Sequence, residues 1–215
     1  MSDILKGIAK FNLDDVGALA VAIECNQYAR EHMNGLPRFT TRRDHLNHAI
    51  GVAPTSGLVL EFGVFSGHTL TLIANGFAHQ QVYGFDSFEG LPEDWMPGSE
   101  KGTFAVGKLP AVPANAELVV GWFDRTLPGF LDAHPGPAAL IHVDCDLYSS
   151  TQTIFTQLKE RIVPGTVIVF DEYWNYPDWK RHEYLAFQEF VAQHRIKYRY
   201  ISLVPDFEMV AVQII

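Results

Sequence analysis

Apolar residues recur with two different periods along this chain, and the period changes near residue 57. Over residues 14–33 they return every three or four positions, a spacing that predicts one long helix. A second helix is expected over about 43–52, before the turn at Pro54. The two segments predict an N-terminal helical cap over residues 1–56.

Downstream of this cap, short apolar runs alternate with helical patterns. The runs lie at residues 58–62, 81–86, 117–123, 138–146 and 165–173, with two more at 198–204 and 207–215. Helices are expected at about 69–78, 150–162 and 179–195. Seven strands that mostly alternate with helices predict an α/β fold, in which helices cover both faces of an open, mainly parallel sheet.

Composition narrows the class of protein and of partner. The chain has 215 residues, of which 47% are hydrophobic, and a formal net charge of −9. These values predict a single domain over residues 1–215, with the sheet core at 57–215. An acidic chain without a basic block disfavours non-specific binding to nucleic acid or to an anionic membrane. Two cysteines, no signal-peptide pattern and no long apolar run predict a cytoplasmic protein.

A glycine-containing turn, residues 63–67, follows the first predicted strand, and we call it the glycine turn. Gly63 and Gly67 allow the backbone to approach a ligand, and the next helix directs its free N–H groups at that ligand. Asp86 ends the second strand, where a carboxylate can accept hydrogen bonds from both ribose hydroxyls. Trp122 and Phe123 end the third strand, where aromatic rings can stack on an adenine. The pattern favours a nucleoside-type ligand; the alternatives are a tight connection, a helix cap and core packing.

Four carboxylates lie at the ends of two predicted strands that are expected to be neighbours. Asp144 and Asp146 lie at the end of the fourth strand, and Asp171 and Glu172 lie at the end of the fifth. One crossover joins these strands, so their tips should lie about 4.8 Å apart. Like charges at that separation raise one another's pKa and cost stability, and a divalent cation with oxygen ligands would resolve the conflict. The alternative is that the acids separate, cap helices and meet water.

Several sequence motifs, in the same order along the chain, are typical of one enzyme family. They are EFGVFSGHTL (61–70), YGFDSFEGLPEDW (83–95), KGTFAVG (101–107), GWFDRTLPGFL (121–131), HVDCDLYSST (142–151) and VFDEYW (169–174). In these segments the chain resembles the class I S-adenosylmethionine-dependent methyltransferases, and within them the macrocin-type (TylF-like) O-methyltransferases. The resemblance implies a Rossmann-like sheet with a final antiparallel strand. It also implies S-adenosylmethionine as cofactor and a small hydroxylated acceptor.

The resemblance also implies roles for individual residues. Cofactor contacts are implied at Glu61, Gly63, Phe65, Ser66, Gly67, Asp86, Ser87, Trp122, Phe123 and Asp144. A magnesium ion, or another divalent cation, is implied on Asp144, Asp171 and Glu172, with Asp146 as the general base. The pair Asp171-Glu172 replaces the Asp-Asp pair of some members, which leaves open which of the two binds the ion.

The chemistry of methyl transfer is consistent with these residues. A sulfonium methyl group is already electrophilic, so the enzyme must align the acceptor and deprotonate its hydroxyl. A metal that binds two adjacent acceptor oxygens lowers the pKa of one of them. We therefore expect a metal-dependent O-methyltransferase that acts on a sugar or another vicinal diol in natural-product metabolism. The alternatives are a nicotinamide-dependent oxidoreductase, which lacks its Gly-x-Gly-x-x-Gly pattern here, and a non-catalytic S-adenosylmethionine-binding protein.

Two further segments bear on substrate access and assembly. Residues 90–107, rich in Gly and Pro and containing Trp95, are expected to form a lid over the acceptor, with an ordinary surface loop as the alternative. The one basic cluster, near residues 38–45, could close on an acidic or sugar-bearing substrate. The helix over 14–33 is apolar enough for a homo-oligomer contact.

Overall fold

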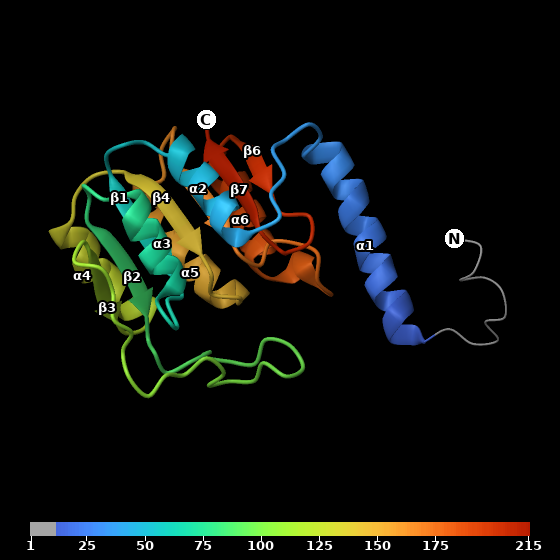
Figure 1. Ribbon diagram of the computed structural model, residues 1–215, viewed down its shortest axis with the longest axis horizontal. Helices are drawn as coiled ribbons and strands as arrows, with labels where there is room; N and C mark the ends of the chain where they lie inside the picture. The colour runs from blue at the N-terminus through green and yellow to red at the C-terminus, as the bar shows by residue number, and fades with distance from the viewer. Residues whose placement is uncertain (1–11) are drawn as a thin grey trace.

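The computed structural model describes residues 12–215 and has one central sheet between two layers of helices (Figure 1). Residues 1–11 of the expected helical cap lie outside the described residues. In chain order the elements are α1 (Leu13–His32), α2 (Arg42–Val52), β1 (Leu58–Phe62), α3 (His68–Gly76), β2 (Val82–Asp86), β3 (Ala116–Val120), α4 (Phe123–Ala133), β4 (Ala138–Val143), α5 (Tyr148–Leu158), β5 (Val167–Phe170), α6 (Glu183–His194), β6 (Tyr198–Leu203) and β7 (Val210–Ile214). Short 3-10 turns precede β5 at Lys159–Arg161 and α6 at Trp179–Arg181.

The strand order confirms the expected sheet. The seven strands lie in the order β3-β2-β1-β4-β5-β7-β6. The first five of these pair in parallel, and β7 runs antiparallel to both β5 and β6. The crossover through α5 makes β4 and β5 neighbours, as the right-handed rule predicts. The carboxyl ends of β1, β2, β4 and β5 therefore meet at one edge of the sheet.

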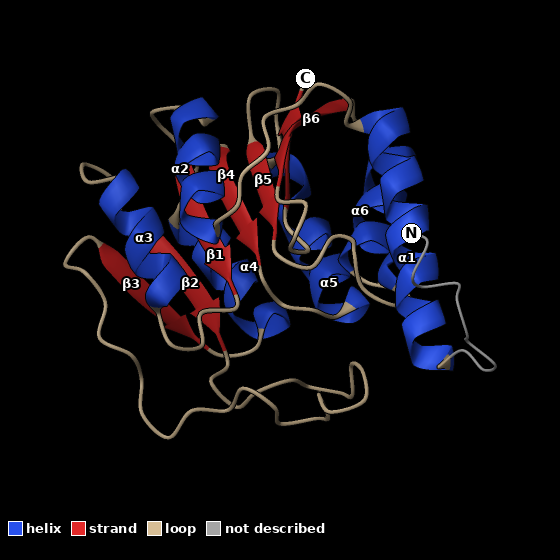
Figure 2. Ribbon diagram, turned by 45° about the vertical axis from the view of Figure 1, so that its right-hand side comes forward, coloured by secondary structure: helices blue, strands red, loops and turns tan. Residues whose placement is uncertain are grey.

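Helices cover both faces of the sheet, as predicted (Figure 2). One buried cluster joins α2 and α3 to the sheet through residues such as Leu46, Ile73 and Val59. The other joins α4, α5 and α6 to the opposite face, through residues such as Phe155 and Phe187. The alternation of side chains along each strand supplies both clusters, because successive residues point to opposite faces.

Helix α4 was not predicted from the sequence. The run at 117–123 was expected to be a strand, but β3 ends at Val120 and a helix begins at Phe123. No element was expected between residues 123 and 138, and Pro128 lies inside this helix, where proline removes a helix hydrogen bond. Burial of Leu127 and Phe130 against the sheet outweighs that cost in the folded chain.

Helix α1 extends along one side of the molecule (Figure 1). Its second half packs through buried Cys25 and Ala29, whereas Leu19 and Ile23 are exposed. None of the helices in residues 12–215 is long and apolar enough to cross a membrane. Both cysteines are free thiols, and both are buried.

Candidate active site

The glycine turn connects β1 to α3 and needs glycine for a structural reason. Gly63 has a φ of +93°, and a Cβ there would lie 1.7 Å from the carbonyl oxygen of Asp144. Gly67 has a φ of +75° and immediately precedes α3. The chain segments that leave β1 and β4 are therefore in direct backbone contact, which only glycine permits at this point.

Asp86, at the end of β2, holds the glycine turn in place. Its Oδ2 accepts hydrogen bonds from the N–H groups of Val64 and Phe65, each at 2.8 Å. Its Oδ1 accepts a bond from the N–H of Phe88 at 2.7 Å. The carboxylate thus engages two backbone donors of the turn, and it faces the cavity described next.

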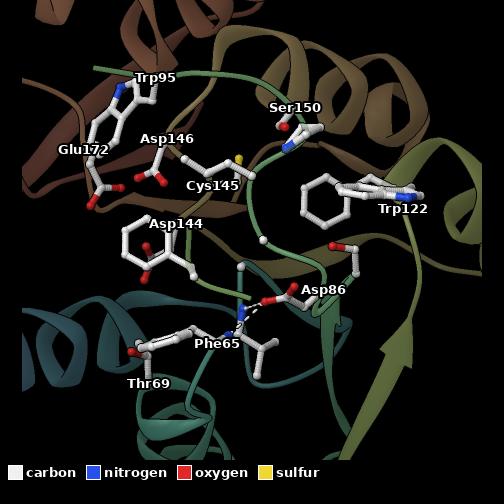
Figure 3. Close-up of a pocket in the computed structure, with 18 of the residues that line it drawn as sticks. Phe65, Thr69, Asp86, Trp95, Trp122, Asp144, Cys145, Asp146, Ser150 and Glu172 are labelled. Carbon is white, nitrogen blue, oxygen red and sulfur yellow. Dashed lines mark hydrogen bonds between the residues drawn. The ribbon is translucent and has the colours of Figure 1, made fainter. Parts of the chain in front are cut away.

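One cavity of about 510 Å³ opens at this edge of the sheet (Figure 3). Several of the expected site residues line it: Gly63, Phe65, Ser66, Asp86, Ser87, Trp122, Phe123, Asp144, Asp146 and Glu172. In Figure 3, Asp86 and Trp122 lie on one side of the cavity, and Asp146 and Glu172 lie on the other. Gly67, Glu61 and Asp171 are not among the lining residues. The cavity thus joins the nucleoside-type features to the carboxylates.

Glu61 lies beneath the cavity, which differs from its expected place against the cofactor. Its side chain is fully buried, and its Oε1 lies 3.1 Å from Nδ1 of His142. Nε2 of the same imidazole lies 3.6 Å from Oδ1 of Asp171. Burial alone would lower the pKa of His142, but the carboxylates of Asp171 and Glu61 outweigh it and raise that pKa to about 10. A buried imidazolium between two carboxylates therefore supports the floor of the site.

Asp171 is held by two basic side chains. Arg42, at the start of α2, donates a hydrogen bond to Oδ2 of Asp171, and its Nη1 lies 3.8 Å from Oδ2 of Asp144. Burial would raise the pKa of Asp171, but His142 and Arg42 outweigh it and lower that pKa. The negative charge of Asp171, which was expected to bind the metal, is thus already compensated by Arg42 and His142. Its side chain also lies outside the cavity lining.

Three other carboxylates, Asp144, Asp146 and Glu172, form what we call the acidic cluster. One oxygen of each lies within 4.8 Å of the others. Within residues 12–215, Asp146 and Glu172 form no ion pair with a basic side chain, and Oε2 of Glu172 is buried without a hydrogen-bond partner. Burial and the Asp171 carboxylate raise the pKa of Asp146 to about 7 and hold that of Glu172 well above its usual range.

The acidic cluster fits a hard divalent cation. Such an ion prefers carboxylate oxygens, and Mg²⁺ usually takes only one or two of them from protein plus water and substrate oxygens. An unpartnered buried carboxylate oxygen is costly, and a bound cation would satisfy it. A second grouping, His142 with Asp144 and Asp171, also lies within 4.8 Å. There Arg42 and the buried imidazolium already supply positive charge.

Two residues of this region were missed or only partly anticipated from the sequence. Arg42 belongs to the basic cluster near residues 38–45, but its bond to Asp171 was not expected. Glu183, the first residue of α6, lies fully buried beside the acidic cluster. No local pattern points to Glu183, because its place depends on how α6 packs against the loops after β4 and β5.

The sequence family agrees with this geometry. The family described as "Methyltransferase domain" matches residues 60–173, which is more than half of the chain. The matched segment contains the glycine turn, Asp86 and the acidic cluster. The chain belongs to this methyltransferase family.

Individual relatives of this methyltransferase-family chain are bacterial. It is 31% identical over 160 residues to the "8-demethyl-8-(2,3-dimethoxy-alpha-L-rhamnosyl)-tetracenomycin-C 4'-O-methyltransferase" of Streptomyces olivaceus, covering 61% of this chain and 60% of that protein. It is 29% identical over 174 residues to the "Demethyldecarbamoylnovobiocin O-methyltransferase" of Streptomyces niveus, covering 69% and 64%. The chain thus spans about three fifths of the length of these curated relatives. In fold it resembles the calicheamicin methyltransferase CalS11, with a TM-score of 0.63 and 24% identity over 80% of this chain and 76% of that one.

Proposed function

We propose that this protein is an S-adenosylmethionine-dependent O-methyltransferase that methylates a hydroxyl group of a small sugar-bearing molecule. The observation that supports this most strongly is the shared cavity. The glycine turn and Asp86, at the end of β2, line one side of this cavity, and the acidic cluster lines the other. A cavity of about 510 Å³ is within the usual range for small-molecule sites.

The cofactor would occupy the side of the cavity near the glycine turn. The N-terminus of α3 presents backbone N–H groups there. Asp86 would accept hydrogen bonds from the ribose hydroxyls, with Ser87 beside it. Trp122 and Phe123 would contact the adenine. Glu61 is too deeply buried for this role and would act through His142.

The acceptor would occupy the side of the cavity near the acidic cluster. Asp144 and Glu172 would hold a divalent cation, and Asp146 would face the acceptor hydroxyl. We leave Asp171 out of the ligand set because Arg42 and His142 already engage it. When bound, the cation would supply positive charge that lowers the pKa of the acceptor hydroxyl.

The transfer itself needs few protein groups. Asp146 accepts the hydroxyl proton as the acceptor oxygen forms a bond to the methyl carbon. The bond between methyl carbon and sulfur breaks, and its electron pair remains on sulfur. The products are the methyl ether, S-adenosylhomocysteine and a proton on Asp146. The walls of the cavity contribute by holding oxygen, carbon and sulfur in line.

We infer a sugar hydroxyl as acceptor from the activity for which one relative is named. The olivaceus protein is a 4'-O-methyltransferase of a rhamnosyl tetracenomycin. A vicinal diol of a sugar also offers two oxygens to a cation. We also expect from the sequence that the protein belongs to the macrocin-type branch, that it is cytoplasmic and that identical chains assemble.

A methyl-transfer assay tests this function. The purified protein is incubated with methyl-labelled S-adenosylmethionine and a panel of rhamnosides, each with and without Mg²⁺. We expect labelled methyl ether only where a vicinal diol is present, and loss of the signal after EDTA. Asp144→Ala should abolish turnover while the affinity for the cofactor, measured by calorimetry, stays nearly unchanged.

The competing functions give different results. Tight binding of NAD without a response to S-adenosylmethionine would favour an oxidoreductase, a reading that the methyltransferase family match already disfavours. Binding of S-adenosylmethionine without transfer to any hydroxylated compound would favour a non-catalytic protein. Transfer that is insensitive to EDTA and to Asp144→Ala would remove the metal from the proposal.

A further inference from the structure

Glu183 is a buried carboxylate outside the cavity lining, and the chemistry proposed above does not use it. It is the first residue of α6 and is fully buried. It takes part in no ion pair within the described chain. Burying a carboxylate without a basic partner costs free energy, so a specific set of hydrogen bonds is expected to compensate.

Both oxygens of Glu183 accept backbone hydrogen bonds, and the two donors lie on different loops. Oε1 accepts the N–H of Cys145 at 3.3 Å, in the loop after β4. Oε2 accepts the N–H of Glu172 at 3.3 Å, in the loop after β5. Cys145 separates two members of the acidic cluster, and Glu172 is the third member. One carboxylate therefore connects the two chain segments that build the cluster.

The ladder between β4 and β5 cannot hold these loops. The last register pair is Val143 with Phe170, and one further bond runs from the N–H of Asp171 to the carbonyl of Val143. Beyond that point the two segments have no backbone bond to each other among the described residues. Glu183 supplies acceptors where the ladder has ended.

The loop after β4 also has an uncommon backbone. Asp146 has a φ of 63°, in the left-handed region, and the N–H of Leu147 bonds to the carbonyl of Cys145 at 2.6 Å. A non-glycine residue in this region costs energy and needs support from its surroundings. The hydrogen bond from the N–H of Cys145 to Glu183 supports the backbone one residue before Asp146.

We infer that Glu183 is a positioning residue that sets the distance between Asp146 and Glu172, and with it the geometry of the acidic cluster. The inference rests on the proposed function, because that function requires the cluster oxygens to converge. Neither oxygen of Glu183 is needed for packing alone, and an apolar side chain would fill the same volume without the cost of a buried carboxylate.

Glu183→Gln tests the inference with almost no change in volume. Glutamine has one carbonyl oxygen, so it can accept from only one of the two N–H groups, and its own amide hydrogens face the other. The matched control is Glu189→Gln on the same helix, where an exposed carboxylate accepts a bond from the hydroxyl of Tyr148.

Amide hydrogen exchange followed by NMR measures the two bonds without any ligand. We expect protected amides at Cys145 and Glu172 in the wild type, and at least tenfold faster exchange of one of them in E183Q. The second measurement is Mn²⁺ affinity, which we expect to weaken about 10- to 100-fold in E183Q, with the KM for S-adenosylmethionine unchanged and kcat lowered. E189Q should match the wild type in each.

Three results would overturn the inference. The first is unprotected amides at Cys145 and Glu172 in the wild type. The second is faster exchange in E183Q with wild-type Mn²⁺ affinity and kcat, which would make Glu183 purely structural. The third is unchanged exchange in E183Q. If E183Q does not fold, Glu183→Asp replaces it, because it keeps both oxygens but withdraws them.

The proposed function fails by a different result. If the wild type binds no Mn²⁺ and transfers no methyl group, the metal and the reaction are wrong. The exchange rates of the two amides then still decide whether Glu183 holds the loops together.

Discussion

Two basic side chains, Arg42 and His142, contact the carboxylate of Asp171 and compensate its charge. Arg42, in α2, donates a hydrogen bond to this carboxylate, and Nε2 of His142, in β4, lies 3.6 Å from its Oδ1. Both favour the ionised carboxylate, which explains its lowered pKa. The neighbouring Glu172 has no such partner, so adjacent residues in the sequence have opposite roles in the structure.

Removal of the Arg42 guanidinium should destabilise the fold. In Arg42→Ala, the buried Asp171 loses its hydrogen-bond donor, which we expect to cost about 2 kcal/mol of unfolding free energy. The arginine side chain is 47% exposed, and solvent screening keeps the loss below that of a fully buried pair. Urea denaturation measures it. The control is Arg43→Ala at an exposed site, and equal stability of the two variants would contradict the prediction.

Asp86 holds the glycine turn and, in the proposed function, binds the ribose, and one substitution tests both contacts. Asp86→Asn keeps the shape but replaces one acceptor oxygen by an amide, so either the bonds to the glycine turn or those to the ribose are lost. We expect the Kd for S-adenosylmethionine, measured by calorimetry, to rise about 10- to 100-fold.

The control for this substitution is Asp132→Asn, an exposed acid in α4 that does not line the cavity. It should bind the cofactor as the wild type does. A wild-type Kd in Asp86→Asn would remove Asp86 from the cofactor site.

At the scale of elements, residues 90–107 connect three parts of the molecule across the cavity. We call them the lid segment, although closure itself remains a prediction. The ring of Phe104 lies 5.7 Å from that of Phe65 in the glycine turn. The hydroxyl of Ser149, in α5, donates to Glu93 at 2.5 Å. Trp95 lies 5.9 Å from Tyr176, centroid to centroid. These contacts attach the lid segment to the turn, to α5 and to the loop before α6.

Phe104→Ala should loosen the lid segment without affecting the core. Phe104 is 45% exposed, so its removal creates no buried cavity. Loss of one aromatic pair is worth about 0.5–1.5 kcal/mol, which predicts about 2- to 10-fold faster release of S-adenosylmethionine. Stopped-flow fluorescence measures the rate. Leu109→Ala, also exposed and outside the cavity lining, is the control, and equal rates in the two variants would count against the contact.

Elements with a strong hydrophobic period were predicted well, and those that depend on packing were not. Helices α1 and α2 and the seven strands lie where the sequence indicated, within a few residues. Helix α4 was missed: it contains Pro128, which opposes a helix, and its stability comes from contact with the sheet. The expected helix at 179–195 is interrupted at His182, and this break brings Glu183 to the start of α6.

At the scale of the whole molecule, the net charge of −9 includes three acids gathered at one edge of the sheet. Binding of a cation to the folded state alone would stabilise it, by about 2.7 kcal/mol at a hundredfold excess over Kd. We therefore expect Mg²⁺ to raise Tm by about 5 °C or more, and EDTA to reverse the rise.

Scanning calorimetry at constant ionic strength measures this effect. NaCl of equal ionic strength controls for screening of the net charge. The double variant Asp144→Asn, Glu172→Gln should no longer respond to Mg²⁺. An equal rise in Tm with NaCl would show that the effect is general screening rather than a site.

The sequence alone determined the α/β class, the glycine turn with Asp86 and the edge where the acids gather. Each of these follows from local periodicity or from the rule that parallel strands end together, whereas the antiparallel strand was implied by the family resemblance. Only the tertiary structure decided the contacts within that edge. It buried Glu61 against His142, engaged Asp171 with Arg42 and brought Glu183 to both acidic loops. These contacts join residues far apart in the chain. The packing of the elements therefore decides whether a carboxylate has a basic side chain beside it or has none.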